Sequence, residues 1–275
     1  MTVKPRSPLG PRQEVEPDPW NAWRNATPAR IALGRAGVAT PMAEALRFGC
    51  AHAMARDAIH TPLDGVLLAQ QLREDGWEVL HAASQAEDRA TYLRRPDLGR
   101  RLRAAGAAAL REHAERTTGS RPQLAIVAGD GLSSLATQRH TRPFLEALRR
   151  NLPDGMVLSP VVVATQARVA IADEIGHLLN AEMVLVLIGE RPGLSSPDSL
   201  GLYLTHAPRP GRSDAERNCV SNVRSAGLSY EAAAFKISWL VRRAKRLGLT
   251  GVALKDESDR EVLDGPDLYP LGDSG

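Results

Sequence analysis

Residues 183–197 read MVLVLIGERPGLSSP, and this stretch decides the fold. Its first six residues are all apolar and rich in Val, Leu and Ile, which is typical of a strand buried on both faces of a parallel sheet. The strand must end soon after Gly189, because Pro192 has no backbone N–H to donate to a neighbouring strand. Ligands of open α/β sheets bind beyond the carboxyl ends of the strands, so we expect Glu190 and Arg191 to lie beside a ligand. The alternative is a structural ion pair, since desolvating a charge is costly unless the charge has a partner.

The wider pattern predicts an α/β fold, with a helical N-terminal region followed by a Rossmann-like doubly wound parallel sheet. From Pro122 onward, strand-like and helix-like segments alternate, which favours parallel strands covered by helices on both faces. In this half we expect strands at 124–128, 156–164, 183–188, 200–205 and 252–254, and helices at 133–151, 166–179 and 229–247. Before it we expect helices at 41–59, 62–74, 84–92 and 96–117, and one short strand at 77–82.

The same pattern divides the chain into four parts. Residues 1–19 contain five prolines and no apolar stretch, so we expect a mobile tail and no secretory signal. Residues 20–119 form the mainly helical N-terminal region, and residues 120–258 form the α/β domain. Residues 259–275 are acidic and contain Pro and Gly, so we expect a frayed tail there.

Composition excludes several functional classes. The 275 residues carry a formal net charge of only +3 and 4% aromatic residues, so a basic nucleic-acid surface with stacking platforms is not expected. No apolar segment reaches the ~18 residues that a membrane helix needs. The two cysteines, Cys50 and Cys219, form neither a disulfide framework nor a metal-binding pair, which suits a cytoplasmic protein.

Two shorter patterns each have a functional and a structural interpretation. The GDG motif at 129–131 follows an expected strand and precedes an expected helix, as phosphate-binding turns do. Ser134 stands where a dinucleotide fingerprint has its third glycine, so we favour a tight turn without a ligand. Glu174 and His177 lie three residues apart on an expected helix, but no third metal ligand has a telling spacing. Together with Asp173 they suit a solvated helix face.

Three longer motifs resemble the small subunit of ethanolamine ammonia-lyase. They are GERPGLSSPDSLG at 189–201, DAERNCVSNVR at 214–224 and DRATYLRRPDLGRR at 88–101. The likeness runs from 18 to 258, and motifs of this length are specific. The resemblance implies an adenosylcobalamin-dependent enzyme that converts ethanolamine to acetaldehyde and ammonia by a radical mechanism, with the cobalamin bound by residues 120–258.

The resemblance also implies a division of labour between two chains. A large subunit, built as a TIM barrel, holds the substrate and performs the rearrangement, whereas the small subunit helps to clamp the cobalamin and is inactive alone. We therefore expect a hetero-oligomer of large and small subunits, with no nucleic acid and no membrane among its partners. We expect no catalytic residue on this chain and no metal ligand of its own, because the cobalt is held within cobalamin.

Three positions match the family's cobalamin contacts, namely Val169, Glu190 and Cys219. Val169 and Glu190 each follow an expected strand, so both can face one crevice. Cys219 lies in an expected polar turn, where a small buried core thiol is the alternative. The secondary candidates are Arg168, Arg191 and Asn222. The chain lacks the D-x-H-x-x-G motif with which other cobalamin families supply a histidine to cobalt, so the resemblance implies a base-on cofactor.

Two rival functions stay open at this point. One is a nucleotide-dependent α/β enzyme that uses the GDG motif, and the other is a non-catalytic scaffold or shell-cargo adaptor without a cofactor. Relatives in the family associate with bacterial microcompartments, but residues 1–17 show no clear amphipathic targeting helix. A bacterial microcompartment therefore stays as an alternative location beside the cytoplasm.

Overall fold

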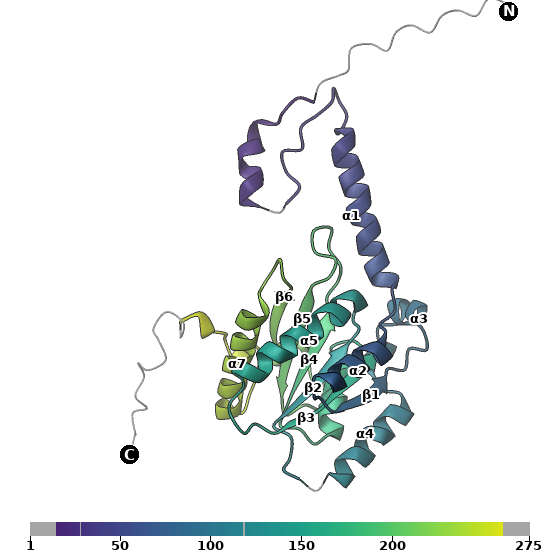
Figure 1. The fold of residues 1–275 in the computed structure, drawn as a ribbon, viewed down its shortest axis with the longest axis vertical. Helices are drawn as coiled ribbons and strands as arrows, with labels where there is room; N and C mark the ends of the chain where they lie inside the picture. Colours follow the sequence, from purple (N-terminus) through teal and green to yellow (C-terminus); the bar gives the residue numbers. More distant parts are fainter. Residues whose placement is uncertain (1–14, 28, 118, 261–275) are drawn as a thin grey trace, which may run out of the picture. The chain divides into compact units, whose positions relative to one another are not determined.

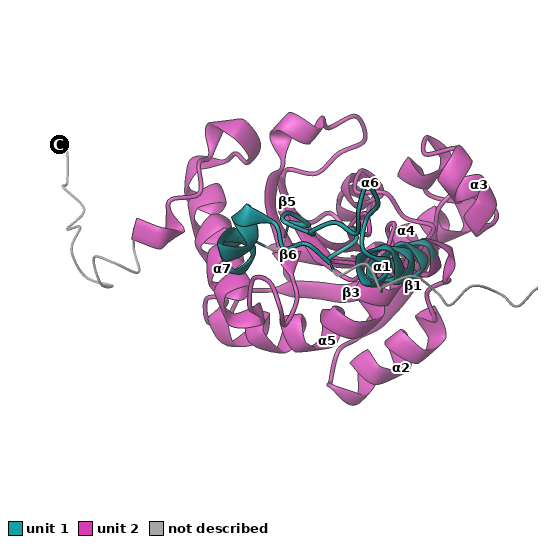
Figure 2. Cartoon of the chain, turned by 90° about the horizontal axis from the view of Figure 1, so that it is seen from above, with its two compact units in different colours: residues 1–56, 193–195 teal, residues 57–192, 196–275 magenta. Residues whose placement is uncertain are grey.

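The computed structural model describes residues 15–27, 29–117 and 119–260, and the chain divides into two compact units (Figure 2). Unit 1 comprises residues 1–56 and 193–195, and unit 2 comprises residues 57–192 and 196–275. Most of the two expected tails, at 1–14 and 261–275, lies outside the described residues.

Unit 1 contains the 3-10 helix η1 (Pro19–Ala26) and most of the helix α1 (Met42–His60). Asp18 caps η1, because its Oδ1 accepts a hydrogen bond of 2.8 Å from the backbone N–H of Trp20. The helix predicted at 41–59 is confirmed by α1. Large apolar side chains of α1 are exposed, and Met42 is the most exposed of them at 73%. The others are Leu46, Phe48 and Met54.

Unit 2 is built on one six-stranded sheet (Figure 1). The strands are β1 (Val79–Ala83), β2 (Leu124–Gly129), β3 (Leu158–Thr165), β4 (Met183–Gly189), β5 (Leu200–His206) and β6 (Asn218–Val223). Their order across the sheet is β1-β3-β2-β4-β5-β6. The first four strands in this order are parallel to one another, and β5 and β6 are each antiparallel to the strand before them.

The sheet is therefore mixed, and the prediction of a doubly wound parallel sheet is wrong for β5 and β6. A parallel connection needs a crossover of a dozen or more residues, usually with a helix. The connection 190–199 between β4 and β5 contains no helix, so the chain turns back and pairs antiparallel. The Rossmann-like description is not confirmed. The last expected strand, at 252–254, is instead the 3-10 turn η4 (Gly251–Ala253).

Helices cover both faces of the sheet. On one face, α2 (Gly65–Glu74), α5 (Ser134–Asn151) and α7 (Tyr230–Leu247) share a core with the strands. On the other face, α4 (Ala104–Arg116) and α6 (Ile171–Leu178) pack on a second core. The short elements α3 (Arg89–Arg94), η2 (Leu98–Arg100) and η3 (Asp214–Glu216) connect them. None of the helices described is long and apolar enough to cross a membrane.

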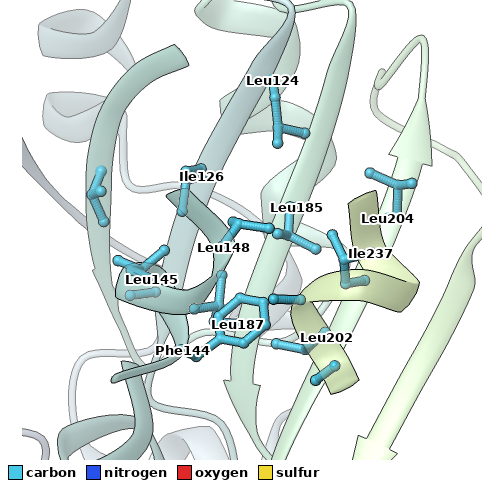
Figure 3. Packing of buried hydrophobic residues seen from close by; sticks show 14 of the residues in the cluster. Leu124, Ile126, Phe144, Leu145, Leu148, Leu185, Leu187, Leu202, Leu204 and Ile237 are labelled. Carbon is cyan, nitrogen blue, oxygen red and sulfur yellow. The ribbon is translucent and has the colours of Figure 1, made fainter. Parts of the chain in front are cut away.

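The core under α5 and α7 explains why these helices form where the sequence predicts them. Phe144, Leu145 and Leu148 of α5 and Ile237 of α7 are fully buried against the leucines of β4 and β5 (Figure 3). Both helices begin at a capping serine. Ser133 and Ser229 each accept a hydrogen bond of 3.3 Å from the N–H three residues on.

Other helix starts differ from the expected ones because capping side chains lie elsewhere. Asp64, not Thr61, caps α2, since its carboxylate accepts the N–H of Leu67 at 2.9 Å. Asp88, not Ser84, caps α3 in the same way, with a distance of 2.7 Å to the N–H of Thr91. The helix expected from 96 begins only at Ala104, after the separate turn η2. The helix expected from 166 begins at Ile171.

Candidate cofactor-binding face

The residues predicted to bind a cofactor lie on one side of the sheet, the side that carries α6. Leu202 of β5 and Val220 of β6 point into the core under α7. Successive side chains of a strand alternate between faces, so Tyr203 and Cys219 point the other way. Tyr203 and Val169 both pack at the margin of the α6 core. The structure therefore brings Val169 to the same side as Cys219.

Strands β5 and β6 lack a covering helix on the α6 side within the described residues. Helix α6 packs against β2 and β4, while α7 covers β5 and β6 from the opposite side. Tyr203 and Cys219 are directly paired across β5 and β6. We call Gly201, Tyr203 and Cys219, with the side chain of Glu190 lying over them, the ligand face. Cys219 is exposed on it, and Glu190 and Tyr203 are half-buried.

Glu190 is fixed at the end of β4 by its backbone and by one carboxylate oxygen. Its N–H donates to the carbonyl of Ser199 at 3.0 Å, and its Oε2 accepts the N–H of Asn222 at 3.1 Å. The carboxylate thus joins the ends of β4 and β6 across β5. The other oxygen, Oε1, has no hydrogen-bond partner among the described residues. Glu190 also forms no ion pair with Arg191 there, so the structural ion-pair alternative is not supported.

Gly201 leaves the space that this carboxylate occupies. A Cβ atom added at Gly201 would lie 3.1 Å from Cγ and 3.2 Å from Oε1 of Glu190, and 3.1 Å from a ring carbon of Tyr203. These contacts are tighter than normal van der Waals distances. The glycine therefore lets the carboxylate lie flat on β5 beside Tyr203.

Tyr203 and Cys219 contribute neutral polar groups to the ligand face. Desolvation raises the pKa of Cys219, and the charge of Glu190 raises it further, against an opposing hydrogen bond with Tyr203. Desolvation likewise raises the pKa of Tyr203. Both groups are therefore protonated at neutral pH. The alternative of a buried core thiol is wrong, because Cys219 is exposed on β6 and not in a polar turn.

Val169 lies in the turn between β3 and α6 and is half-buried. The turn starts with Gln166, whose φ of 55° is in the left-handed region that residues other than glycine rarely adopt. This local geometry explains why α6 starts five residues later than predicted. Arg168 of the same turn lies over the Tyr92 ring at 4.3 Å, so this secondary candidate has a structural contact.

The GDG motif at 129–131 does not form a phosphate-binding turn. A Cβ atom on Gly131 would lie only 2.1 Å from the carbonyl oxygen of Gly189, and Gly131 has a φ of 59°. The N–H of Leu132, at the start of the turn into α5, already donates to that carbonyl at 2.9 Å. The crevice between the ends of β2 and β4 is thus filled by backbone, which supports the tight-turn interpretation.

The expected solvated helix face on α6 is wrong for two of its three residues. Asp173 is buried and forms an ion pair with Arg217, which leads into β6. Glu174 accepts the N–H of Leu102 at 2.9 Å. Among the described residues, no three His, Cys, Asp or Glu side chains are grouped in a way that would hold a metal ion.

Comparison with known proteins decides the family. Residues 17–255 match the family model described as ethanolamine ammonia-lyase light chain (EutC). The chain belongs to this family. The resemblance found in the motifs at 189–201 and 214–224 is therefore confirmed.

Relatives of this light-chain family match over nearly their whole length. A protein named ethanolamine ammonia-lyase small subunit from Azotobacter vinelandii is 55% identical over 264 residues, which cover 95% of this chain and 97% of that protein. One of the same name from Pseudomonas aeruginosa is 57% identical over 249 residues, covering 90% and 91%. Another, from Pseudomonas putida, is 53% identical over 255 residues, covering 92% and 93%.

The sequence did not predict the site residues of this light chain whose position depends on strand pairing. Gly201 and Tyr203 were expected in a strand, but only the pairing of β5 with β6 places them under Glu190 and beside Cys219. The sequence of Asn218–Val223 carries little signal for this strand, because a buried Asn218 and an exposed Cys219 reverse the expected pattern. For the pairing of Asp173 with Arg217, the sequence contains no signal.

Proposed function

We propose that this chain is the small subunit of an adenosylcobalamin-dependent ethanolamine ammonia-lyase. This carbon–nitrogen lyase converts ethanolamine to acetaldehyde and ammonia by a radical mechanism. The chain binds part of the cobalamin and acts only with a large catalytic subunit. The observation that carries the proposal is the ligand face, where Glu190 and Cys219 lie on the same side of the sheet as Val169.

The side chains of this face fit a cobalamin, which carries amide and hydroxyl groups around an apolar ring. Glu190 Oε1, which lacks a partner among the described residues, is an acceptor for an amide N–H or a hydroxyl. Tyr203 and Cys219 are neutral and can donate or accept, and Val169 offers apolar contact. When bound, the cofactor supplies the radical chemistry. The role of these side chains is to bind it, orient it and exclude water.

The cofactor is proposed to be base-on, with its own dimethylbenzimidazole on cobalt. The reason is the missing D-x-H-x-x-G motif, which leaves this chain without the usual source of a cobalt-binding histidine. Electron paramagnetic resonance of the complex with a nitrogen-labelled base tests this. Coupling to the labelled base is expected, and coupling to a histidine nitrogen would contradict it.

A large-subunit partner is supported by the exposed apolar side chains of α1. A helix that exposes several large apolar side chains normally packs against another protein surface. Along residues 42–54 of α1, most side chains are exposed, including Leu46 and Phe48. We propose that the large subunit covers this helix. The cytoplasmic location, with a bacterial microcompartment as the alternative, stays a prediction.

The test of the proposed function is a reconstituted complex of this chain with a large subunit. Adenosylcobalamin is titrated into the wild type, Glu190→Gln and Glu190→Ala, and acetaldehyde formation is measured at each cofactor concentration. Loss of a charge-assisted hydrogen bond costs ~1.5–3 kcal/mol, so the cofactor Kd should rise by a factor of roughly 10 to 150. The matched control is Glu146→Gln, which removes an exposed carboxylate of α5 beyond the opposite face of the sheet.

Each rival function predicts a different outcome of this titration. A scaffold without a cofactor predicts that Glu190→Ala leaves both the cofactor Kd and the activity of the complex unchanged. A nucleotide-dependent enzyme predicts that the purified chain binds NAD(P) without a large subunit. Either result would overturn the proposal.

A further inference from the structure

We propose that Asp130 is a positioning residue for the cofactor site, because it holds the turn that carries Val169. Asp130 lies in the GDG motif after β2, and its side chain is 2% exposed. The role assigned here rests on the proposed function, in which Val169 contacts cobalamin. Asp130 itself lies beneath the turn and acts through it.

Two consecutive backbone amides of the turn point at this carboxylate. The N–H of Ala167 donates to Oδ1 at 2.7 Å, and the N–H of Gln166 donates to Oδ2 at 2.9 Å. Successive N–H groups beside a left-handed residue form a concave anion site, and Gln166 has a φ of 55°. In this protein, the anion in that site is the protein's own Asp130.

Arg89 of α3 completes the surroundings of the carboxylate. Its guanidinium lies 3.3 Å from Asp130 Oδ2 and donates to the carbonyls of Gly131 at 2.8 Å and Leu132 at 3.2 Å. Its Nε donates to the carbonyl of Ile59 at 2.8 Å. Burial raises the pKa of Asp130, but the amides of the turn and the charge of Arg89 oppose that shift. Each of these partners is a donor, so they suit a carboxylate and not an amide.

Tyr92 anchors the same turn through a carbonyl group. This fully buried side chain donates its hydroxyl proton to the carbonyl of Ala167 at 3.0 Å. Two guanidinium groups lie over its ring, with Arg89 at 4.8 Å and Arg168 at 4.3 Å from the ring centre. The N–H of Arg168 donates to Gly99 at 2.8 Å. Val169 thus follows three residues whose backbone is held in place.

The consequence is a turn that is ordered before any ligand arrives. When only a fraction of molecules has the binding-competent arrangement, the apparent Kd rises by the inverse of that fraction. An Asp130→Asn variant keeps the size of the side chain but offers one carbonyl oxygen to two amides and presents an NH2 group to donors. If the turn is then competent in roughly a tenth of molecules, the cofactor Kd rises about tenfold.

The experiment uses the reconstituted complex with a large subunit and adenosylcobalamin as the probe. Asp130→Asn should raise the cofactor Kd about tenfold while kcat at saturating cofactor is unchanged. Val169→Ala removes apolar contact and should raise the Kd about fivefold. The double variant should combine the two factors into a rise of about fiftyfold, because Val169→Ala raises the intrinsic Kd and Asp130→Asn lowers the binding-competent fraction.

The matched control is Ser229→Ala, which removes the cap of α7 on the opposite face of the sheet. It lowers the melting temperature but should leave the cofactor Kd unchanged, which separates a positioning effect from a general loss of stability. If Asp130→Asn does not assemble, Tyr92→Phe replaces it, since this variant removes only the hydroxyl bond to Ala167. A severalfold rise in Kd is expected for Tyr92→Phe.

The outcomes separate this inference from the proposed function. A raised Kd for Val169→Ala with an unchanged Kd for Asp130→Asn, or for Tyr92→Phe in its place, overturns the positioning role alone. A kcat at saturating cofactor that falls for Asp130→Asn also overturns it, because a smaller competent fraction changes only the Kd. If neither Val169→Ala nor Glu190→Ala alters the Kd, the proposed function itself fails.

Discussion

The buried ion pair between Asp173 and Arg217 predicts a large loss of stability when one charge is removed alone. Both side chains are 2% exposed, and the pair joins α6 to the start of β6. Arg217→Met leaves the Asp173 carboxylate buried without its partner, which costs about 3–5 kcal/mol. In a protein of this size each kcal/mol lowers the melting temperature by about 2–4 °C, so the expected fall is roughly 6–20 °C.

Urea unfolding of the isolated chain at pH 7.5 measures this free energy, with thermal unfolding as a second readout. The double variant Asp173→Leu/Arg217→Met should recover most of the loss, because replacing both charges with apolar groups is often neutral. The control is Arg150→Met, since Arg150 forms its ion pairs at the surface and the expected cost is below about 1 kcal/mol. The reasoning is refuted if Arg217→Met is no more destabilising than this control, or if the double variant is no more stable than Arg217→Met.

Three further predictions concern pH and two glycines. Burial raises the pKa of Asp173 to about 6 from its ordinary value of 3.8. The stability that this group contributes is therefore present below about pH 4 and is lost as the pH rises through about 6. Asp173→Asn should remove this pH dependence from the free energy of unfolding, measured in urea. Gly201→Ala should cost about 1–3 kcal/mol of stability and weaken cobalamin binding, because the new methyl group crowds Glu190. The control Gly119→Ala, at an exposed position with open space around it, should do neither. Gly131→Ala should cost at least ~2 kcal/mol of stability, because its Cβ would overlap the backbone of Gly189 and its φ is left-handed. The melting temperature should fall accordingly. A melting temperature equal to that of the wild type would contradict the close packing of the turn after β2 against the end of β4.

The sequence predicted the elements whose signals are local. The strands at 124–128 and 183–188 are continuous apolar runs, and the helices at 133–151 and 229–247 begin at capping serines, so each pattern is complete within its own segment. The strand β6 escaped prediction because its polar residues resemble a turn until β5 is beside it. The antiparallel direction of β5 was missed although the helix-free connection before it was visible.

The site residues, too, could be predicted only where the signal is local. Glu190 was expected near a ligand because it follows a buried strand, and the structure leaves one of its carboxylate oxygens without a partner among the described residues. The roles of Gly201 and Asp130 depend on atoms that approach across long stretches of sequence, as when Asp130 meets the amides of Gln166 and Ala167. Such approaches follow from strand order and register, which no single segment encodes.

The exposed apolar side chains of α1 bear on how the chain is made. A copy that has found no binding partner presents Met42, Leu46, Phe48 and Met54 to chaperones and proteases, which recognise such surfaces. Under the proposal that the large subunit covers α1, the amount of this chain that survives in the cell should follow the supply of that subunit. Balanced synthesis of the two subunits is the consequence of that proposal.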